Sequence, residues 1–191
     1  MNKRLLLAGW GTLLVFPLLG WFILQFFEDD PLNMMVRGDL PIILQLVYGL
    51  GLGVVFGKIA SWVISLPALR DSSEKYVHMI STLNLRLPAI LFLSFCAGFG
   101  EELLFRGAIQ PLLGIWLTAI IFVAIHGYIN PLNWRISVYG VAMTGIIACL
   151  GWMTEIWGIF SACAAHMAID VVLFTYLAGR SRQNNFQNQH A

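Results

Sequence analysis

Ionisable side chains inside apolar stretches of this sequence could carry chemistry, and they are Glu101, Glu102, Arg106, His126, His166 and Asp170. A charge at the centre of a bilayer costs at least about 2.5 kcal/mol per group. A segment that only anchors a chain would therefore use apolar residues at these positions. We interpret the six residues as a functional cluster, and the competing interpretation is an internal ion pair that fixes helix packing.

Spacing separates the two interpretations. Glu102 and Arg106 are four residues apart, so they share a helix face and can form an ion pair. Adjacent helical residues point about 100° apart, so Glu101 faces another direction and needs a different partner. His166 and Asp170 are also four residues apart, and both can face one cavity. Helix packing alone thus accounts for Glu102 and Arg106 but leaves Glu101 unexplained.

Three of these residues are expected at a similar depth in the membrane. At about 1.5 Å per residue, Glu101 and His126 each lie about 18 Å from the outer end of their spans. His166 lies about 15 Å from the outer end of its own span by the same measure. Polar residues with unrelated structural roles would not be expected to lie at the same depth in the membrane. We therefore predict that Glu101, His126 and His166 converge on one polar cavity near the midplane.

This set of side chains is suited to activating water. A carboxylate and a histidine can together hold a water molecule and remove its proton, which is general-base catalysis. A second histidine can donate a hydrogen bond to the oxyanion formed when water attacks a carbonyl group. Alternatively, two histidines and one or two carboxylates can bind zinc, with Glu101, His126, His166 and Asp170 as the candidate ligands. The HExxH metalloprotease motif is absent, and no other cofactor is predicted.

The composition predicts that membrane helices position these residues. The chain has 191 residues, of which 59% are hydrophobic and 11% charged, whereas a soluble domain carries about 25% charge. About 20 apolar residues span a bilayer, and the candidate spans are residues 5–27, 40–66, 87–113, 114–129, 136–153 and 156–179. We predict an all-α, polytopic membrane helix bundle of about six transmembrane helices around a polar cavity. Residues 1–179 form its single domain, and the polar tail 180–191 is expected to be disordered.

Other patterns refine this picture. Gly49, Gly53 and Gly57 repeat every four residues, so they share one helix face and allow another helix to approach closely. Apolar residues at helical spacing within 76–83 predict a short helix on the membrane surface. With six spans and a cytoplasmic N-terminus, Arg37 is the one basic residue of the outer loops, so we predict that both termini are cytoplasmic. The net charge is +1 without a basic, aromatic-rich patch, so nucleic acid is not an expected partner.

The sequence resembles a known protein family. Residues 101–106, Glu-Glu-Leu-Leu-Phe-Arg, look like the EExxxR motif of the CAAX protease and bacteriocin-processing family, also called the Abi family. Residues 122–126, which end in His126, match its FxxxH motif, and His166 with a polar residue four positions later matches its third motif. The resemblance covers about residues 87–177, and three motifs in order make it specific.

The resemblance implies a helical bundle around a conical cavity and peptide-bond hydrolysis within the membrane without a covalent intermediate. Carried over by position, Glu101 would be the base and His126 its partner on the water. Glu102 and Arg106 would be a supporting pair, and His166 would help to stabilise the oxyanion. By analogy with the family, such a small chain is expected in a prokaryotic plasma membrane. The lipid bilayer and a peptide or membrane-protein substrate would be its partners.

Asp170 departs from the family pattern, because eukaryotic CAAX endopeptidases have Asn at this position. Asn donates a hydrogen bond, whereas an ionised Asp cannot. Asp170 is therefore expected to be protonated, to orient His166 or to bind a metal. The departure weakens the oxyanion role for Asp170 and favours the metal alternative.

Three functions are consistent with these observations. The leading hypothesis is an intramembrane endopeptidase that cleaves a membrane-associated peptide or protein. The second is a non-enzymatic membrane immunity or assembly factor, in which the motifs have outlasted activity. The third is a proton-coupled transporter, since buried carboxylates and histidines also serve as proton relays. Against the transporter, the chain is short and shows no internal repeat.

Overall fold

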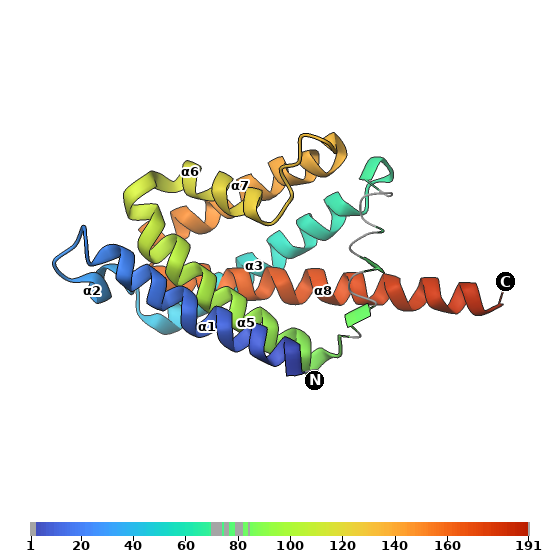
Figure 1. The fold of residues 1–191 in the computed structure, drawn as a ribbon, viewed down its shortest axis with the longest axis horizontal. Helices are drawn as coiled ribbons and strands as arrows, with labels where there is room; N and C mark the ends of the chain where they lie inside the picture. The colour runs from blue at the N-terminus through green and yellow to red at the C-terminus, as the bar shows by residue number, and fades with distance from the viewer. Residues whose placement is uncertain (1–2, 70–73, 75–76, 79–81, 84, 191) are drawn as a thin grey trace.

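The computed structural model describes all residues except 1–2, 70–73, 75–76, 79–81, 84 and 191, and these described residues form helices and no strands (Figure 1). The elements are α1 (Lys3–Leu24), α2 (Pro31–Met35), α3 (Ile42–Ile64), the 3-10 turn η1 (Pro67–Leu69), α5 (Leu87–Leu104), the π-helix η2 (Phe105–Ile109), α6 (Gln110–Ile125), α7 (Trp134–Ile156) and α8 (Ile159–His190). The predicted surface helix depends on Tyr76, Met79 and Ile80, which lie outside the described residues.

Within the described residues, five helical segments are long and apolar enough to cross a membrane, and the longest is the 39-residue stretch Leu87–Ile125. This stretch is bent rather than straight, because Gly114 has φ +76° and ψ 168°, a non-helical conformation that L side chains rarely adopt. The chain turns back there, so α6 returns over the bundle beside α7 (Figure 1). The bend falls at the predicted boundary between the third and fourth spans. The prediction of an all-α bundle of about six transmembrane helices is confirmed.

The C-terminal tail differs from the prediction. We expected residues 180–191 to be disordered, but α8 continues to His190 and projects beyond the other helices (Figure 1). The tail has no proline to stop a helix, and it contains Arg and Gln, which are good helix formers. A polar composition argues against burial of the tail but does not by itself prevent it from extending an existing helix.

The predicted glycine face of α3 packs along α8. A Cβ atom at Gly53 would lie 2.7 Å from the Cα of Ala165, and a Cβ at Gly57 would lie 3.2 Å from the Cα of Ile169. Only residues without side chains permit two helix backbones to come this close, so this prediction is confirmed. The close packing fixes the rotation of α8 about its axis. As a result, His166 and Asp170 are directed away from α3.

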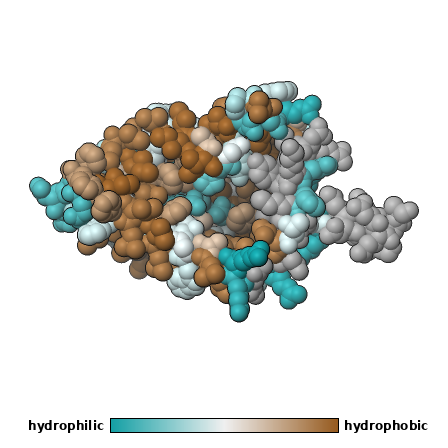
Figure 2. Space-filling model, viewed as in Figure 1, coloured by the Kyte–Doolittle hydropathy of each residue, from teal (hydrophilic) through white to brown (hydrophobic). Residues whose placement is uncertain are grey.

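Two further glycines hold α5 between α1 and α8. A Cβ at Gly98 would lie 2.8 Å from the backbone nitrogen of Met167 in α8. A Cβ at Gly100 would lie 3.1 Å from the Cα of Leu13 in α1. Glu101 is the next residue, so its position is set by close backbone packing on both sides of α5. Figure 2 shows the resulting bundle as a mainly hydrophobic surface with a hollow near its middle, in which polar residues are visible.

Candidate active site

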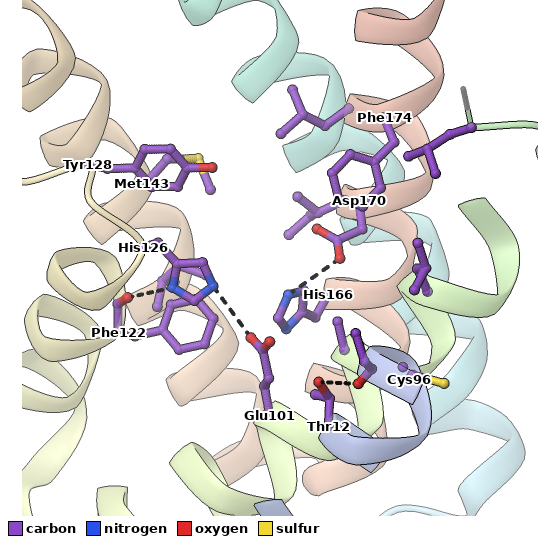
Figure 3. Close-up of a pocket in the computed structure, with 18 of the residues that line it drawn as sticks. Thr12, Cys96, Glu101, Phe122, His126, Tyr128, Met143, His166, Asp170 and Phe174 are labelled. Atoms are coloured by element: carbon purple, nitrogen blue, oxygen red, sulfur yellow. Dashed lines mark hydrogen bonds and ion pairs between the residues drawn. The ribbon is translucent and has the colours of Figure 1, made fainter. Parts of the chain in front are cut away.

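The predicted residues meet at a cavity of about 300 Å³ (Figure 3). Its wall is formed by parts of α1, α5, α7 and α8 together with the end of α6, and it is mostly apolar. Glu101, His126, His166 and Asp170 all line it. The structure therefore brings together the four residues that were candidates for catalysis, and they come from three different helical segments.

Glu101 and His126 face each other across the cavity (Figure 3). His126 Nδ1 lies 2.7 Å from the backbone oxygen of Phe122. A carbonyl oxygen can only accept, so Nδ1 carries a hydrogen and donates it. Nε2 of the neutral ring is then an acceptor, and it lies 3.6 Å from Glu101 Oε2. Glu101 Oε2 has no hydrogen-bond partner among the described residues, so the two groups present two facing acceptors.

Local sequence explains the placement of His126. The residue directly follows α6, and Gly127 with φ +76° takes the left-handed conformation that commonly ends a helix. The Phe122 ring, one turn earlier, stacks on the imidazole at a centroid distance of 4.4 Å. Tyr128 stacks on it as well, at 6.2 Å. The imidazole is thus held by one hydrogen bond and two aromatic rings while its Nε2 points to Glu101.

Glu102 turns away from Glu101 and forms the predicted ion pair. Its Oε2 lies 3.1 Å from Arg106 Nε, and the two side chains are 0% and 1% exposed. Arg106 Nη2 also donates to the carbonyl oxygen of Ile147 at 3.2 Å, and the guanidinium carbon lies 5.1 Å from the centre of the Phe122 ring. A buried charge is tolerated when it is paired and hydrogen-bonded. Arg106 Nε and Nη2 have such partners, whereas Nη1 has none among the described residues.

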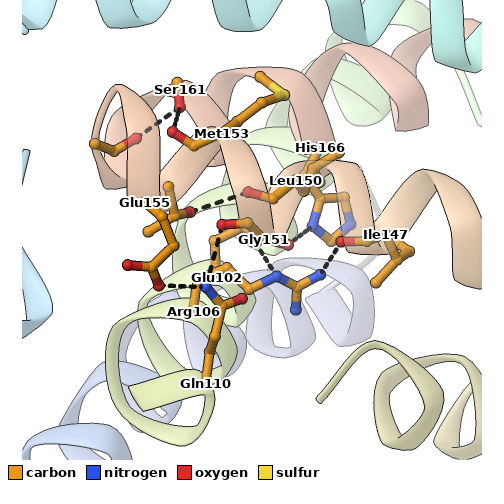
Figure 4. A network of polar contacts seen from close by, with 12 residues as sticks. Glu102, Arg106, Gln110, Ile147, Leu150, Gly151, Met153, Glu155, Ser161 and His166 are labelled. Carbon is orange, nitrogen blue, oxygen red and sulfur yellow. Dashed lines mark hydrogen bonds and ion pairs between the residues drawn. The ribbon is translucent and has the colours of Figure 1, made fainter. Parts of the chain in front are cut away.

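The other oxygen of Glu102 reaches a second helix. Glu102 Oε1 lies 2.8 Å from His166 Nδ1 (Figure 4). On the far side of the same ring, His166 Nε2 lies 3.8 Å from Asp170 Oδ2. Both ring nitrogens of His166 therefore face carboxylates. Asp170 therefore lies beside His166 at the wall of the same cavity.

Arg106 belongs to a π-helix, which was not anticipated. In η2 the backbone N–H of Gln110 donates to the carbonyl of Phe105, five residues earlier. π-Helices are rare, and short ones inside α-helices frequently occur at functional sites. Here the wider turn lies between the glutamates of α5 and the start of α6. No periodicity in the sequence distinguishes such a turn from an α-helix.

The described residues contain no group of three or more His, Cys, Asp or Glu side chains arranged to hold a metal ion. His166 Nδ1 lies 2.8 Å from Glu102 Oε1 and is therefore occupied. His126 Nε2 lies 3.6 Å from Glu101 Oε2, and His166 Nε2 lies 3.8 Å from Asp170 Oδ2. A catalytic zinc site needs three protein ligands. The zinc set of Glu101, His126, His166 and Asp170 therefore stays a prediction.

Two contributions to the site were missed by the sequence analysis. Ala8, Gly9 and Thr12 of α1 line the cavity, although that helix was predicted only as an anchor. No motif marks them, so no sequence signal could have identified them. Gln110 lies one turn beyond Arg106 and contacts α7. Its spacing of four residues from Arg106 was a usable signal.

Comparison with known proteins identifies the same region. Residues 83–172 match the family model described as type II CAAX prenyl endopeptidase Rce1-like. Over 111 residues, the chain is 30% identical to the uncharacterized protein YpbD of Bacillus subtilis (strain 168), a match that covers 54% of this chain and 54% of that protein. The chain thus matches about half the length of this curated relative, and no solved structure matches it. Residues 83–172 contain all six residues of the predicted cluster, and over this region the chain is similar to the type II CAAX prenyl endopeptidase family.

Proposed function

We propose that the protein is an intramembrane endopeptidase that hydrolyses a peptide bond of a membrane-associated peptide or protein. The observation that carries this proposal is the pair of facing acceptors, Glu101 Oε2 and His126 Nε2, at the wall of the cavity. A water molecule has two protons, and it can donate one to each acceptor. Its oxygen lone pairs are then directed away from both side chains and toward a carbonyl carbon bound in the cavity.

The reaction follows from this placement. Glu101 takes a proton from the water as the water oxygen bonds to the carbonyl carbon, and the carbonyl oxygen becomes an oxyanion. When the oxyanion collapses, the C–N bond breaks and Glu101 returns the proton to the departing amine. One water molecule is consumed, and a carboxylic acid and an amine are released. No covalent bond between protein and substrate is needed.

His166 is the proposed donor to the oxyanion. Its Nδ1 is held by Glu102, so the ring is fixed in orientation with Nε2 toward the cavity. A protonated Nε2 donates to the oxyanion as charge develops, which is the interaction that lowers the barrier in acyl transfer. Glu102 and Arg106 are buried and neutralise each other, and so they support the ring without adding net charge to the site.

Substitution of Asp170 tests how the oxyanion is stabilised. An ionised carboxylate near His166 Nε2 repels an oxyanion, whereas a protonated Asp or an Asn donates a hydrogen bond to it. We expect Asp170→Asn to preserve kcat and Asp170→Ala to lower it by about 10²-fold, the usual cost of losing one such donor. Steady-state cleavage of a peptide by purified protein in detergent measures both values. Equal losses in the two variants would contradict a donor role, and a loss of bound zinc in Asp170→Asn would favour the metal alternative.

We also propose that both termini and the cavity entrance are cytoplasmic. The cavity is lined by Ala8 near the start of α1 and by Leu85 just before α5, on the side of the bundle where both termini lie (Figure 1). In a variant without native cysteines, a cysteine at Asp29 is expected to react with an impermeant maleimide on intact cells. A cysteine at Arg135 is expected to react only after permeabilisation. The reverse labelling pattern would show that both termini lie on the outer side of the membrane.

A further inference from the structure

We propose that Gln110 and Glu155 are positioning residues that hold Arg106, and with it His166, in the arrangement that hydrolysis requires. The inference rests on the proposed peptidase function, and it assigns a role to residues at the end of the bundle away from both termini. Neither residue lines the cavity. Both would act through the ion pair between Arg106 and Glu102.

Hydrogen bonds to two backbone carbonyl groups of α7 join it to η2 and to the start of α6 (Figure 4). Gln110 is 2% exposed, and its Nε2 donates to the carbonyl oxygen of Gly151 at 3.1 Å. One turn earlier, Arg106 Nη2 donates to the carbonyl oxygen of Ile147 at 3.2 Å. Ile147 and Gly151 are also one turn apart. The two side chains therefore bind successive turns of α7, and displacement of one changes the position of the other.

The α7 backbone is shaped to receive Gln110. A Cβ at Gly151 would lie 2.6 Å from Gln110 Oε1, so a larger residue would push the amide away. Glycine destabilises the interior of a helix. The space that the Gln110 amide needs gives a packing reason for glycine at position 151.

Glu155 completes the contact and links it to the surface. Glu155 Oε1 accepts a hydrogen bond from Gln110 Nε2 at 2.7 Å and one from Arg37 Nη2 at 2.8 Å. Arg37 Nη1 also donates to the carbonyl oxygen of Met34 at 3.2 Å. Polar contacts thus extend from the loop between α2 and α3 through Glu155 to Gln110, which lies one turn along the helical segment from Arg106.

The π-helix makes Arg106 dependent on this support. Residues of a π-turn lack the regular i to i−4 backbone bonds that fix an α-helix, and π-helices are less favourable than α-helices. The position of the Arg106 side chain is therefore set largely by what it binds. If Gln110 no longer binds α7, Arg106 and Glu102 are expected to shift, and Glu102 Oε1 is then moved relative to His166 Nδ1.

Two substitutions of Glu155 separate its charge from its hydrogen bond. Glu155→Gln keeps an oxygen acceptor for Gln110, whereas Glu155→Ala removes it. We expect Glu155→Ala to lower kcat by about 3- to 30-fold with KM within about twofold, the range typical of residues that act through others. Glu155→Gln should remain closer to the unmodified protein. Asp39→Asn is the matched control, because Asp39 is an exposed carboxylate in the same loop as Arg37.

A spectroscopic readout tests positioning without depending on activity. In protein labelled with ¹⁵N-histidine, the ring signals of His166 are identified by their loss in His166→Ala. Glu155→Ala and Gln110→Leu are expected to shift these signals and to leave those of His78 unchanged. Gly151→Ala, which displaces Gln110 without removing a polar group, should shift them in the same way and remains informative if the other two variants fold poorly.

The outcomes distinguish this inference from the proposed function. Folded variants whose His166 signals and kcat match those of the unmodified protein would overturn the positioning role. Shifted His166 signals in a protein that cleaves no peptide in any form would leave the positioning role in place and refute the peptidase. A fall in thermal stability with unchanged kcat and unchanged His166 signals would show a merely structural contact.

Discussion

Glu101→Gln is expected to abolish peptide hydrolysis, with a fall in kcat of about 10²–10⁴-fold. Gln has the size of Glu but cannot take a proton, so the attacking water would remain neutral. Its amide would also present a donor to His126 Nε2, which lies 3.6 Å from the carboxylate in the structure, and so fill the place of the water. The fold should persist, because Arg106 keeps Glu102 as its partner. Cleavage products measured by mass spectrometry, together with the melting temperature in detergent, check both statements.

Two comparisons make the result interpretable. Asp39→Asn removes an exposed carboxylate and should leave kcat unchanged. His126→Ala should be as inactive as Glu101→Gln, since it removes the second acceptor for the same water. A cell in which Glu101→Gln retains full biological function would instead support a non-enzymatic immunity or assembly factor. That outcome would end the peptidase proposal.

Arg106→Ala is expected to destabilise the folded protein by about 3–5 kcal/mol, the cost of leaving one member of a buried ion pair alone. Glu102 is 0% exposed, so its carboxylate stays buried when the cation of Arg106 is removed. The contact with the Phe122 ring and the hydrogen bond to Ile147 would be lost as well. Folded yield and unfolding in mixed micelles measure the effect.

A double variant provides the control for this prediction. Glu102→Gln combined with Arg106→Met removes both charges and should recover much of the stability, because no unpaired charge remains. It should not recover activity, since the carboxylate that holds His166 Nδ1 is absent. A single variant as stable as the unmodified protein would show that Glu102 is neutralised by other means.

Local spacing accounts for the parts of the site that could be predicted. The pair of Glu102 and Arg106 and the glycine face of α3 both follow from helical periodicity, which acts within one helix and is visible in one sequence. The contact between Glu102 and His166 joins α5 to α8, 64 residues apart. It depends on the rotation of both helices, and a single sequence does not specify that rotation. The composition predicted that the cluster would be buried but not which carboxylate would bind which histidine.

Backbone irregularities lie beyond that local reasoning. The predicted boundary between the third and fourth spans falls at Gly114, whose positive φ makes the bend. The π-helix of Phe105–Ile109 has no comparable marker, since its one unusual residue, Gly107, is of a type that also occurs inside the regular helix α3. The contribution of Thr12 depends on how α1 packs against Gly100, which again is a tertiary property.

Because α8 is one uninterrupted helix, it can transmit force from its C-terminal end to the site. The helix begins where Gln45 Oε1 accepts a hydrogen bond from the Phe160 backbone, carries His166 and Asp170, and continues to His190. From Asp170 to its end it is about 30 Å long at 1.5 Å per residue. The part of this length up to Ser181 is packed in the bundle, since Leu173, Leu177 and Ser181 are buried, and the rest projects as an arm. A load applied to the arm acts on the packed part of the same helix that carries Asp170, so a tag or tether at the C-terminus is not a neutral addition, whereas α1 is a separate helix.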